Sequence, residues 1–229
     1  IGNLGDFSPR AIQTLEKVDF LAVEDTRVTV KLLNHFGLKK EMLSYYEHNK
    51  ASKGNLILER LLAGETCALM SDAGMPAISD PGEDLVRLCH QNGAEVESVP
   101  GPSAITTALS IAGMPSGRFC FEGFLTTQKN GRKQHLESLK AESRTMIFYE
   151  APHKLPATLN DMLKYFGNRE IALVRELTKI HETVLITTLE KAVEHYSENT
   201  PKGEFVLIIR GAEEKSEEYS LQDAVKLAE

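Results

Sequence analysis

The sequence predicts an α/β protein with two α/β domains, the first built on a mostly parallel sheet and the second on a mixed sheet. Across the first half of the chain, short apolar runs alternate with amphipathic segments, which is typical of parallel strands covered by helices on both faces. Residues 113–117, GMPSG, have the composition of a linker. Beyond them, five strand-like runs follow with only three helix-like segments between them, which indicates a mixed sheet.

The elements of the first half follow from their periodicity and their end signals. Ser8 and Pro9 begin a helix, because Ser is a good N-cap and Pro suits the first turn. Asp80 is the predicted cap of the helix after Pro81. Residues 1–6 have the composition of a strand-to-helix loop, so a further strand is expected upstream. The other predicted strands are 19–24, 42–46, 67–72 and 95–99, and the other predicted helices are 26–37, 53–63 and 103–113.

The second half is richer in strands. The runs 170–177 and 181–189 are separated by a short turn, so we expect them to pair antiparallel. The remaining predicted strands are 118–125, 145–151 and 202–211. We therefore predict an N-terminal domain over 1–114, a C-terminal domain over 115–212, and an acidic linker over 213–229 that begins a truncated helical region.

The composition is that of a soluble globular protein, and it excludes a membrane span. The chain has 229 residues, 41% hydrophobic and 26% charged, and no run of eighteen apolar residues. Cys67, Cys89 and Cys120 form no CxxC pair and lie in apolar surroundings. Widely spaced apolar cysteines are typical of reduced thiols, so a cytoplasmic location is expected.

The net charge does not settle whether the protein binds nucleic acid. The formal charge is −7, and residues 213–229 contribute six acidic and two basic side chains to it. Residues 126–135, in contrast, carry Lys129, Arg132, Lys133 and His135 with no acid. This segment is either a solvated face or a contact for phosphates, and we favour the second.

Three turns rich in small residues follow predicted strands. They are GNLGD at 2–6, SDAGMPAISDPG at 71–82 and PGPSA at 100–104. Ligands of open parallel sheets bind beyond the carboxyl ends of the strands, and glycines let backbone approach a ligand closely. Each turn alone could be a tight helix start, but three at one edge predict a ligand cleft. None is a dinucleotide or triphosphate loop.

Several ionisable residues lie at predicted strand ends. Arg27 either pairs with Asp25 or grips a phosphate, and His48 is either structural or a contact for RNA. The turn between 170–177 and 181–189 brings together Arg175, Glu176, His181 and Glu182. It is either a surface ion-pair network or, as we favour, part of a functional site.

Eight segments, in this order and spacing, resemble one protein family. They are IGNLGDFSPRA, VEDTR, YYEHN, SDAGMPAISDPG, VPGPSA, FYEAPHK, RELTKIHE and KGEFVLII. Together they resemble the tetrapyrrole-methylase superfamily of S-adenosylmethionine-dependent methyltransferases, and its branch that methylates the ribose 2′-oxygen of a cytidine in the decoding region of 16S rRNA. The segments VEDTR, SDAGMPAISDPG and FYEAPHK together are specific to this branch. The family's first strand and most of its C-terminal helical region are not in this sequence.

The resemblance implies a fold, a cofactor and partners. The fold is the tetrapyrrole-methylase type with the cofactor cleft between the domains, and the cofactor is S-adenosylmethionine. The partners are 16S rRNA in the small ribosomal subunit and a second copy in a homodimer, with no membrane and no metal. The implied cofactor-binding residues are Asp72, Ala73, Gly74, Met75, Pro76, Ser103, Ala104, Tyr149, Ala151, Gly203 and Glu204. The candidate substrate-binding residues are Arg27, His48, Lys129, Arg132 and Lys133.

Methyl transfer to a ribose hydroxyl benefits from a group that orients or deprotonates the hydroxyl. Glu182, His181 and Glu150 are the candidates, and the sequence does not choose among them. Two alternatives remain open. One is a methyltransferase of the same fold that acts on a tetrapyrrole or another small substrate, since fold alone does not fix function. The other is a protein that binds the cofactor without turnover.

Overall fold

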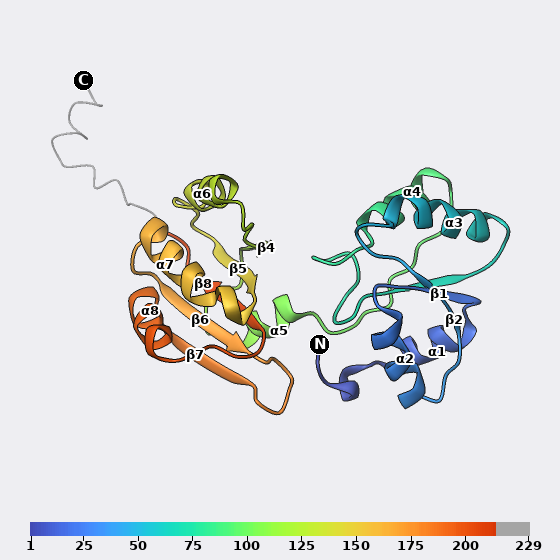
Figure 1. Ribbon diagram of the computed structural model, residues 1–229, viewed down its shortest axis with the longest axis horizontal. Coiled ribbons are helices and arrows are strands. Elements are labelled where there is room, and N and C mark those ends of the chain that lie inside the picture. Colours follow the sequence, from blue (N-terminus) through green and yellow to red (C-terminus); the bar gives the residue numbers. More distant parts are fainter. Residues whose placement is uncertain (214–229) are drawn as a thin grey trace, which may run out of the picture.

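The computed structural model describes residues 1–213, which form two sheets flanked by helices (Figure 1). The first sheet has the order β2-β1-β3 and is parallel throughout. The second has the order β4-β5-β8-β6-β7, with only β4 and β5 parallel. The predicted parallel and mixed sheets are therefore confirmed. The strands are β1 (Phe20–Val23), β2 (Glu41–Ser44), β3 (Cys67–Met70), β4 (Phe119–Phe124), β5 (Thr145–Glu150), β6 (Glu170–Arg175), β7 (Thr183–Thr188) and β8 (Phe205–Ile209).

Alternating side chains of β1 face two different helix layers. Phe20 and Ala22 belong to a core closed by α3 and α4, whereas Leu21 and Val23 belong to a core closed by α1 and α2. A strand buried on both faces reads as a continuous apolar run, as FLAV does. The helices of this half are α1 (Pro9–Lys17), α2 (Thr26–His35), α3 (Lys50–Leu62) and α4 (Glu83–Gln91), preceded by the short 3-10 helix η1 (Leu4–Asp6).

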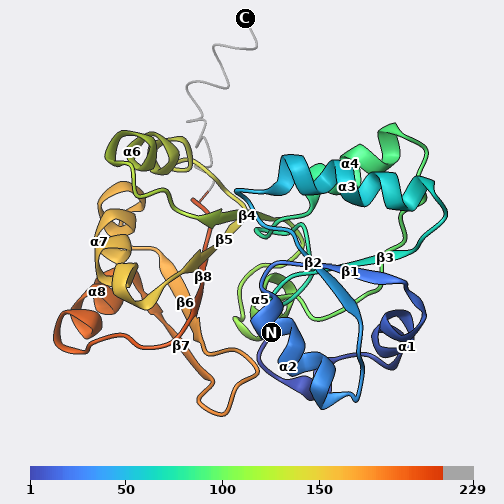
Figure 2. The ribbon, with the colours of Figure 1, turned by 45° about the vertical axis from the view of Figure 1, so that its right-hand side comes forward.

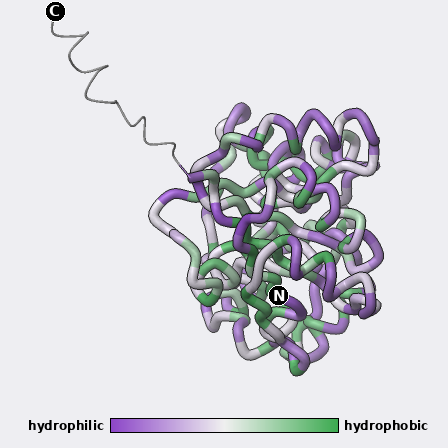
Figure 3. The backbone as a smooth tube through the Cα atoms, turned by 90° about the vertical axis from the view of Figure 1, so that its left-hand side faces the viewer, coloured by the Kyte–Doolittle hydropathy of each residue, from purple (hydrophilic) through white to green (hydrophobic). Residues whose placement is uncertain are grey.

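The second sheet is also covered on both faces. Helices α6 (Lys129–Ser138), α7 (Leu155–Phe166) and α8 (Leu189–Glu198) pack on one face (Figure 2). The other face is covered by α5 (Ala104–Ile111), and a short 3-10 helix η2 (Pro152–Lys154) precedes α7. Hydrophobic segments gather inside and hydrophilic ones run along the outside (Figure 3).

Helix α5 lies within the predicted N-terminal domain but packs on the second sheet. The prediction placed it in the N-terminal domain, over 1–114. Its side chains Ile105, Ala108 and Leu109 pack instead with Ile147 and Ile208 of the second sheet. The packing boundary therefore lies before α5, and the loop 99–103 joins the two halves.

Three local predictions were wrong. Residues 95–99 form no strand, because β3 pairs only with β1 in the described part of the chain, and a strand needs a hydrogen-bonded neighbour. Asp80 does not cap α4, whose N-cap is Gly82. The helix expected from residue 53 begins earlier, at Lys50.

Other local predictions are confirmed. The Ser8 hydroxyl accepts a hydrogen bond from the Ala11 N–H and caps α1, and β6 pairs antiparallel with β7. The predicted acidic segment lies, beyond Glu213, outside the described residues. None of the helices within residues 1–213 has the length and apolar character needed to cross a bilayer.

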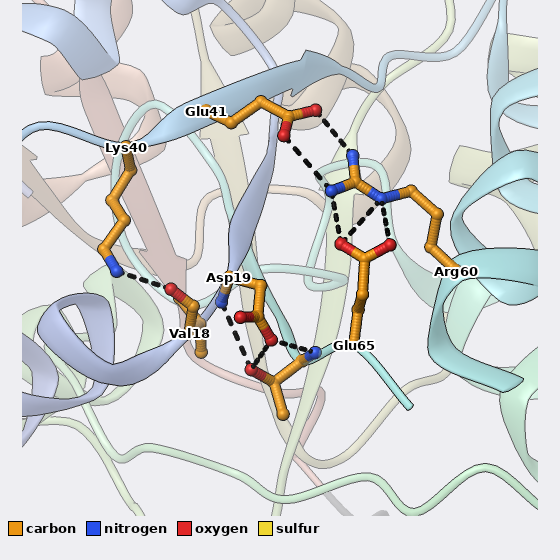
Figure 4. A network of polar contacts seen from close by, with 7 residues as sticks. Val18, Asp19, Lys40, Glu41, Arg60 and Glu65 are labelled. Carbon is orange, nitrogen blue, oxygen red and sulfur yellow. Dashed lines mark hydrogen bonds and ion pairs between the residues drawn. The ribbon is translucent and has the colours of Figure 1, made fainter. Parts of the chain in front are cut away.

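The amino ends of the first sheet are closed by paired charges. The Arg60 guanidinium binds both Glu41 and Glu65 (Figure 4) and lies 3.7 Å over the Phe20 ring centroid. The Asp19 carboxylate accepts hydrogen bonds from the backbone and hydroxyl of Thr66, each at 2.7 Å. The hydrogen bonds to Thr66 lower the pKa of Asp19, and the hydrogen bonds from Arg60 lower the pKa of Glu41. This edge therefore stabilises its carboxylates in the charged form.

A buried polar chain links β5, α6 and α7. Arg132 donates to the Asp161 carboxylate at 2.6 Å and to the Thr158 hydroxyl at 2.8 Å. That hydroxyl donates to the Glu150 carboxylate, which also accepts from the Ala151 N–H at 2.8 Å. Glu150 and Thr158 are only 3% and 1% exposed. A buried carboxylate depends on such partners. This series of hydrogen bonds therefore fixes α6 and α7 on the sheet.

We predict that Thr158→Val destabilises the protein by about 3 kcal/mol, because it leaves the buried Glu150 carboxylate short of a donor. The control is Thr145→Val, since Thr145 is 2% exposed and donates one hydrogen bond, to the Pro115 carbonyl. Loss of that neutral hydrogen bond should cost about 1 kcal/mol. Urea denaturation of both variants measures the difference, and equal losses would contradict the proposed importance of the Glu150 chain.

Candidate active site

The carboxyl ends of β1 and β3 are tied together through backbone N–H groups. The Glu24 carboxylate, directly after β1, accepts from the Asp72 N–H at 3.3 Å. The Asp72 carboxylate accepts in return from the Asp25 N–H at 3.2 Å. Adjacent parallel strands bring their following loops to one edge. The exchange fixes the start of the 71–82 loop against the start of α2.

Arg27 is held by its own helix cap. Asp25 is the N-cap of α2 and accepts from the Arg27 backbone N–H at 2.8 Å, and the Arg27 guanidinium binds the same carboxylate at 2.6 Å. These hydrogen bonds lower the pKa of Asp25 to about 2. The predicted alternative of an Asp25 salt bridge is thus present, yet the Arg27 side chain is 87% exposed and faces solvent.

Asp80 lies in the same acidic neighbourhood and forms no ion pair with any residue in 1–213. Burial, and then the nearby charges of Glu24 and Asp72, raise the pKa of Asp80 to about 6, although the Ser71 hydroxyl binds it. Burial also raises the pKa of Asp72. The two edges of one sheet therefore differ, since the pKa values of Asp19 and Glu41 fall at the paired amino edge, whereas those of Asp72 and Asp80 rise at this carboxyl edge.

The loop 71–82 adopts backbone conformations that are unusual for non-glycine residues. Gly74 has φ +84°, and Ala77 and Ser79 have φ +66° and +63°. A Cβ added to Gly74 would lie 3.3 Å from the Ile1 side chain and 3.7 Å from the Pro102 carbonyl. Positive φ at non-glycine residues is costly and recurs at functional sites. The loop bends tightly back toward residues 1–2 and 100–102.

A cavity of ≈ 460 Å³ opens beside this loop. Its lining is formed by residues 1–4, the facing sides of α1 and α2, β3, and the loops 71–76 and 99–102. A mostly apolar cavity of this size, with a few polar groups, is typical of a small-molecule site.

The three predicted small-residue turns converge at this cavity. Residues 2–4, 71–76 and 100–102 all line it, so Asp72, Ala73, Gly74, Met75 and Pro76 lie together as expected of a ligand pocket. Ser103, Ala104, Tyr149, Ala151, Gly203 and Glu204 are not among its lining residues.

The second half approaches this site through β4 and β5. A Cβ added to Gly123 of β4 would lie 3.3 Å from the Ser79 hydroxyl. Tyr149, at the end of β5, packs edge-on against Phe121 and Phe124, with ring centroids 4.9 and 5.5 Å apart. Burial, and then the charge of Asp80, raise the pKa of Tyr149 to about 12. The 71–82 loop thus lies beside the β4–β5 end.

The predicted catalytic residues do not come together. Glu150 is buried under α7 and bound by Thr158 and Ala151, so its carboxylate is committed to these contacts. The physical reason is its neighbour, since Thr158 offers a buried donor. The exposed Glu182 carboxylate accepts from the Thr178 N–H at 2.5 Å in the β6–β7 turn, and His181 is exposed beside it.

The same turn holds the predicted Gly203–Glu204 segment. Glu176 and Glu204 both pair with Lys179 at 2.9 Å, and a Cβ at Gly203 would overlap Glu176. This ion-pair network also contacts the chain start, because the Thr178 hydroxyl donates to the Ile1 carbonyl at 2.6 Å.

The predicted basic segment forms α6, but its charges are not equally available. The Arg132 side chain is 14% exposed and committed to Asp161. His135 lies 2.9 Å from the Glu122 carboxylate. Lys133 is 58% exposed and 3.7 Å from Glu137, and Lys129 is exposed without an ion pair among the described residues. His48 is exposed and packs near Tyr46.

Sequence reasoning missed Glu24 and Asp80 as members of this site. From the sequence, Asp80 was predicted to be a helix cap, and Glu24, the neighbour of Asp25, was given no role. The available signal was the number of carboxylates, since VEDTR and SDAGMPAISDPG supply four acids after two strands with one arginine between them.

Comparisons with known proteins agree with this architecture. A family model described as Tetrapyrrole (Corrin/Porphyrin) Methylases matches residues 1–193. "Ribosomal RNA small subunit methyltransferase I" of Synechocystis sp. is 50% identical over 213 residues, covering 93% of this chain and 76% of that protein. The protein of the same name from Thermotoga maritima is 45% identical, covering 93% and 96%.

Solved structures match at low identity and show the fold alone. Diphthine synthase matches with a TM-score of 0.69 at 13% identity, covering 92% of this chain and 86% of that one. Uroporphyrin-III C-methyl transferase from Thermus thermophilus, complexed with S-adenyl homocysteine, matches with a TM-score of 0.60 at 15% identity, covering 91% and 93%.

We predict that Asp80→Asn stabilises the fold at pH 7.5. The folded pKa of Asp80, about 6, exceeds the ordinary unfolded value near 3.9. The charged form therefore penalises folding fully above about pH 6, and the penalty disappears as pH falls toward 4. After allowance for solvent screening, the gain should be about 1 kcal/mol.

Denaturation midpoints of parent and variant between pH 4 and 8 measure this gain. The control is Asp84→Asn, because hydrogen bonds and charge from Lys50 and Arg87 lower the pKa of Asp84. That variant should lose stability at pH 7.5, which is the opposite sign. A pH-independent difference for Asp80→Asn would contradict the assigned charge penalty.

Proposed function

Because the chain belongs to the tetrapyrrole methylase family, we propose that it is an S-adenosylmethionine-dependent methyltransferase whose substrate is ribosomal RNA of the small ribosomal subunit. One observation carries this proposal. Relatives named ribosomal RNA small subunit methyltransferase I are 44–51% identical over 93–100% of this chain. The finer proposal is that the acceptor is the ribose 2′-oxygen of a cytidine.

The cavity fits this cofactor. A Cβ at Gly74 would project toward Ile1 and Pro102, so the loop forms a cradle that a side chain would fill. When bound, S-adenosylmethionine supplies an electrophilic methyl group on a positively charged sulfonium. Asp72 and Lys31 both line the cavity, and Glu24 and Asp80 lie near Asp72. The carboxylates outnumber Lys31, so the local field favours a positive ligand.

The polypeptide must align the hydroxyl and receive its proton. In-line alignment alone contributes several kcal/mol to such displacements. Glu150 is committed to holding α7, which leaves Glu182 and His181 in the β6–β7 turn. Asp80 joins them as a candidate, because its near-neutral pKa suits a proton acceptor. If the pH–rate profile of the parent has an inflection near pH 6 that Asp80→Asn lacks, Asp80 is the proton acceptor. An unchanged pH–rate profile in the variant would exclude Asp80.

The alternatives differ in what becomes methylated. The protein should transfer labelled methyl groups from S-adenosylmethionine to 16S rRNA in small subunits, and mass spectrometry of the digested RNA should find 2′-O-methylcytidine. Transfer to a tetrapyrrole instead would favour the first alternative, and cofactor binding with no transfer would favour the second. Pairing of two copies stays a prediction, which a mass by light scattering would test.

We predict that Gly74→Leu weakens S-adenosylmethionine binding at least about 30-fold, because overfilling a packed site costs roughly 2 kcal/mol. Gly93→Leu is the matched control, since Gly93 has φ +73° with nothing within 4 Å of an added Cβ. Both variants carry similar backbone strain, but only one fills the cavity. Calorimetry that finds equal affinities would overturn the assignment of this loop.

The exposed lysines of α6 support a contact with RNA phosphates. We predict that a Lys129→Glu and Lys133→Glu double variant binds rRNA about tenfold more weakly at moderate salt. It should also reduce the slope of log affinity against log salt by about 1.4, the value for two phosphate contacts on a single strand. Arg132 is left in place because it supports Glu150.

Filter binding over a salt series measures both quantities. The control is Lys164→Glu with Lys191→Glu, which changes the charge equally on α7 and α8. Equal effects in the two double variants would mean that net charge alone matters. Cofactor affinity should stay unchanged in both.

A further inference from the structure

Phe124 is an aromatic side chain left open at the end of a strand. It is 55% exposed, more than any other phenylalanine or tyrosine among residues 1–213. Exposing a large apolar ring to water is unfavourable. This exposed ring follows Gly123, which lies against the 71–82 loop, so it is a candidate contact for a ligand.

A β-bulge in the backbone of β4 sets the direction of this ring. The β4–β5 pairing shifts register between Phe121 and Gly123, and Gly123 has φ +64°. A bulge re-aims the side chains that follow it, and such bulges recur next to active sites. Here the bulge lies against Ser79 of the 71–82 loop, so Phe124 emerges beside the cofactor loop.

The ring has a rigid support behind it. Phe124 packs edge-on against Tyr149 with centroids 5.5 Å apart and an interplanar angle of 63°, and Tyr149 packs likewise on Phe121 at 4.9 Å. This edge-type packing leaves Phe124 55% exposed, so the ring remains available for stacking.

The charges around the ring favour a neutral, flat ligand attached to an anionic chain. Lys129 and Lys133 lie at the start of α6, which follows β4 after four residues. Asp80 lies near Tyr149, the ring that packs against Phe124. A nucleobase is uncharged and stacks on aromatic rings, whereas its phosphates require cations. The base can therefore meet Phe124 while the phosphates stay near the lysines.

We infer that Phe124, braced by Tyr149 and Phe121, is a stacking platform for an unpaired nucleobase of the RNA substrate. This inference rests on the proposed rRNA methyltransferase activity, which it extends to a named contact. A protein partner is the less fitting occupant, because such an interface needs a broad buried patch rather than one ring.

The first test is kinetic. Phe124→Ala should lower kcat/KM for small subunits about 10- to 100-fold, the effect of losing one base stack, with S-adenosylmethionine affinity unchanged. Phe124→Leu should lose as much, whereas Phe124→Trp should stay within about threefold of the parent. Phe119→Ala is the control, because Phe119 is 38% exposed at the opposite end of β4 and should change little.

Equal losses in Phe124→Ala and Phe119→Ala would overturn the inference, as would full activity of Phe124→Leu, since leucine keeps an apolar contact but cannot stack. A change in molecular mass of Phe124→Ala by light scattering would also overturn it, because the ring would then serve contact with another protein chain.

The second test does not depend on methylation. The sequence contains no tryptophan, so Phe124→Trp introduces one fluorophore at the platform. Added single-stranded 16S rRNA fragments should quench its emission, and Phe119→Trp should not respond. Absence of quenching would overturn the platform even if the parent methylates small subunits. Quenching by RNA with no methylation by the parent would support the platform and refute the proposed activity.

Discussion

The exchange of backbone hydrogen bonds between Glu24 and Asp72 is the constraint on which the site depends. Each carboxylate accepts an N–H from the loop that follows the other strand, so neither loop can move without breaking a charge-assisted hydrogen bond. The loop 71–82 starts from this fixed point and turns back through Gly74. The cavity between this loop and residues 100–102 follows from that geometry.

Charged side chains are paired differently at the two edges of the first sheet. At the amino edge, Arg60 neutralises Glu41 and Glu65, which stabilises the charged forms. At the carboxyl edge, Glu24 and Asp80 lie near Asp72, which lines the cavity together with Lys31, while Arg27 is held by Asp25. Clustered like charges in a half-buried position oppose folding. The acidic edge is therefore better explained by a positively charged ligand than by stability.

The second half contributes surfaces rather than the pocket itself. Its sheet holds α5 between the two halves, and the chain from Glu150 through Thr158 to Arg132 keeps α6 and α7 in place. That support leaves Lys129 and Lys133 exposed on α6, which begins after a four-residue connection from Phe124. An acidic protein can hold an anionic polymer in this way, because the positive surface is local and separate from the carboxylates that surround the cofactor loop.

Much of this protein could be predicted from sequence, because strands, helices and small-residue turns obey local rules. The parallel and mixed sheets, the Ser8 cap, the β6–β7 hairpin and the convergence of three turns all followed from periodicity and turn composition. Residues 95–99 have strand composition but no partner to pair with. Likewise, local sequence could not show that Glu150 points to Thr158, that Arg132 is consumed by Asp161, or that Asp80 stands near Glu24. These outcomes depend on which groups meet across the fold, and only the tertiary structure decides burial and charge partners, since both arise from residues distant in sequence.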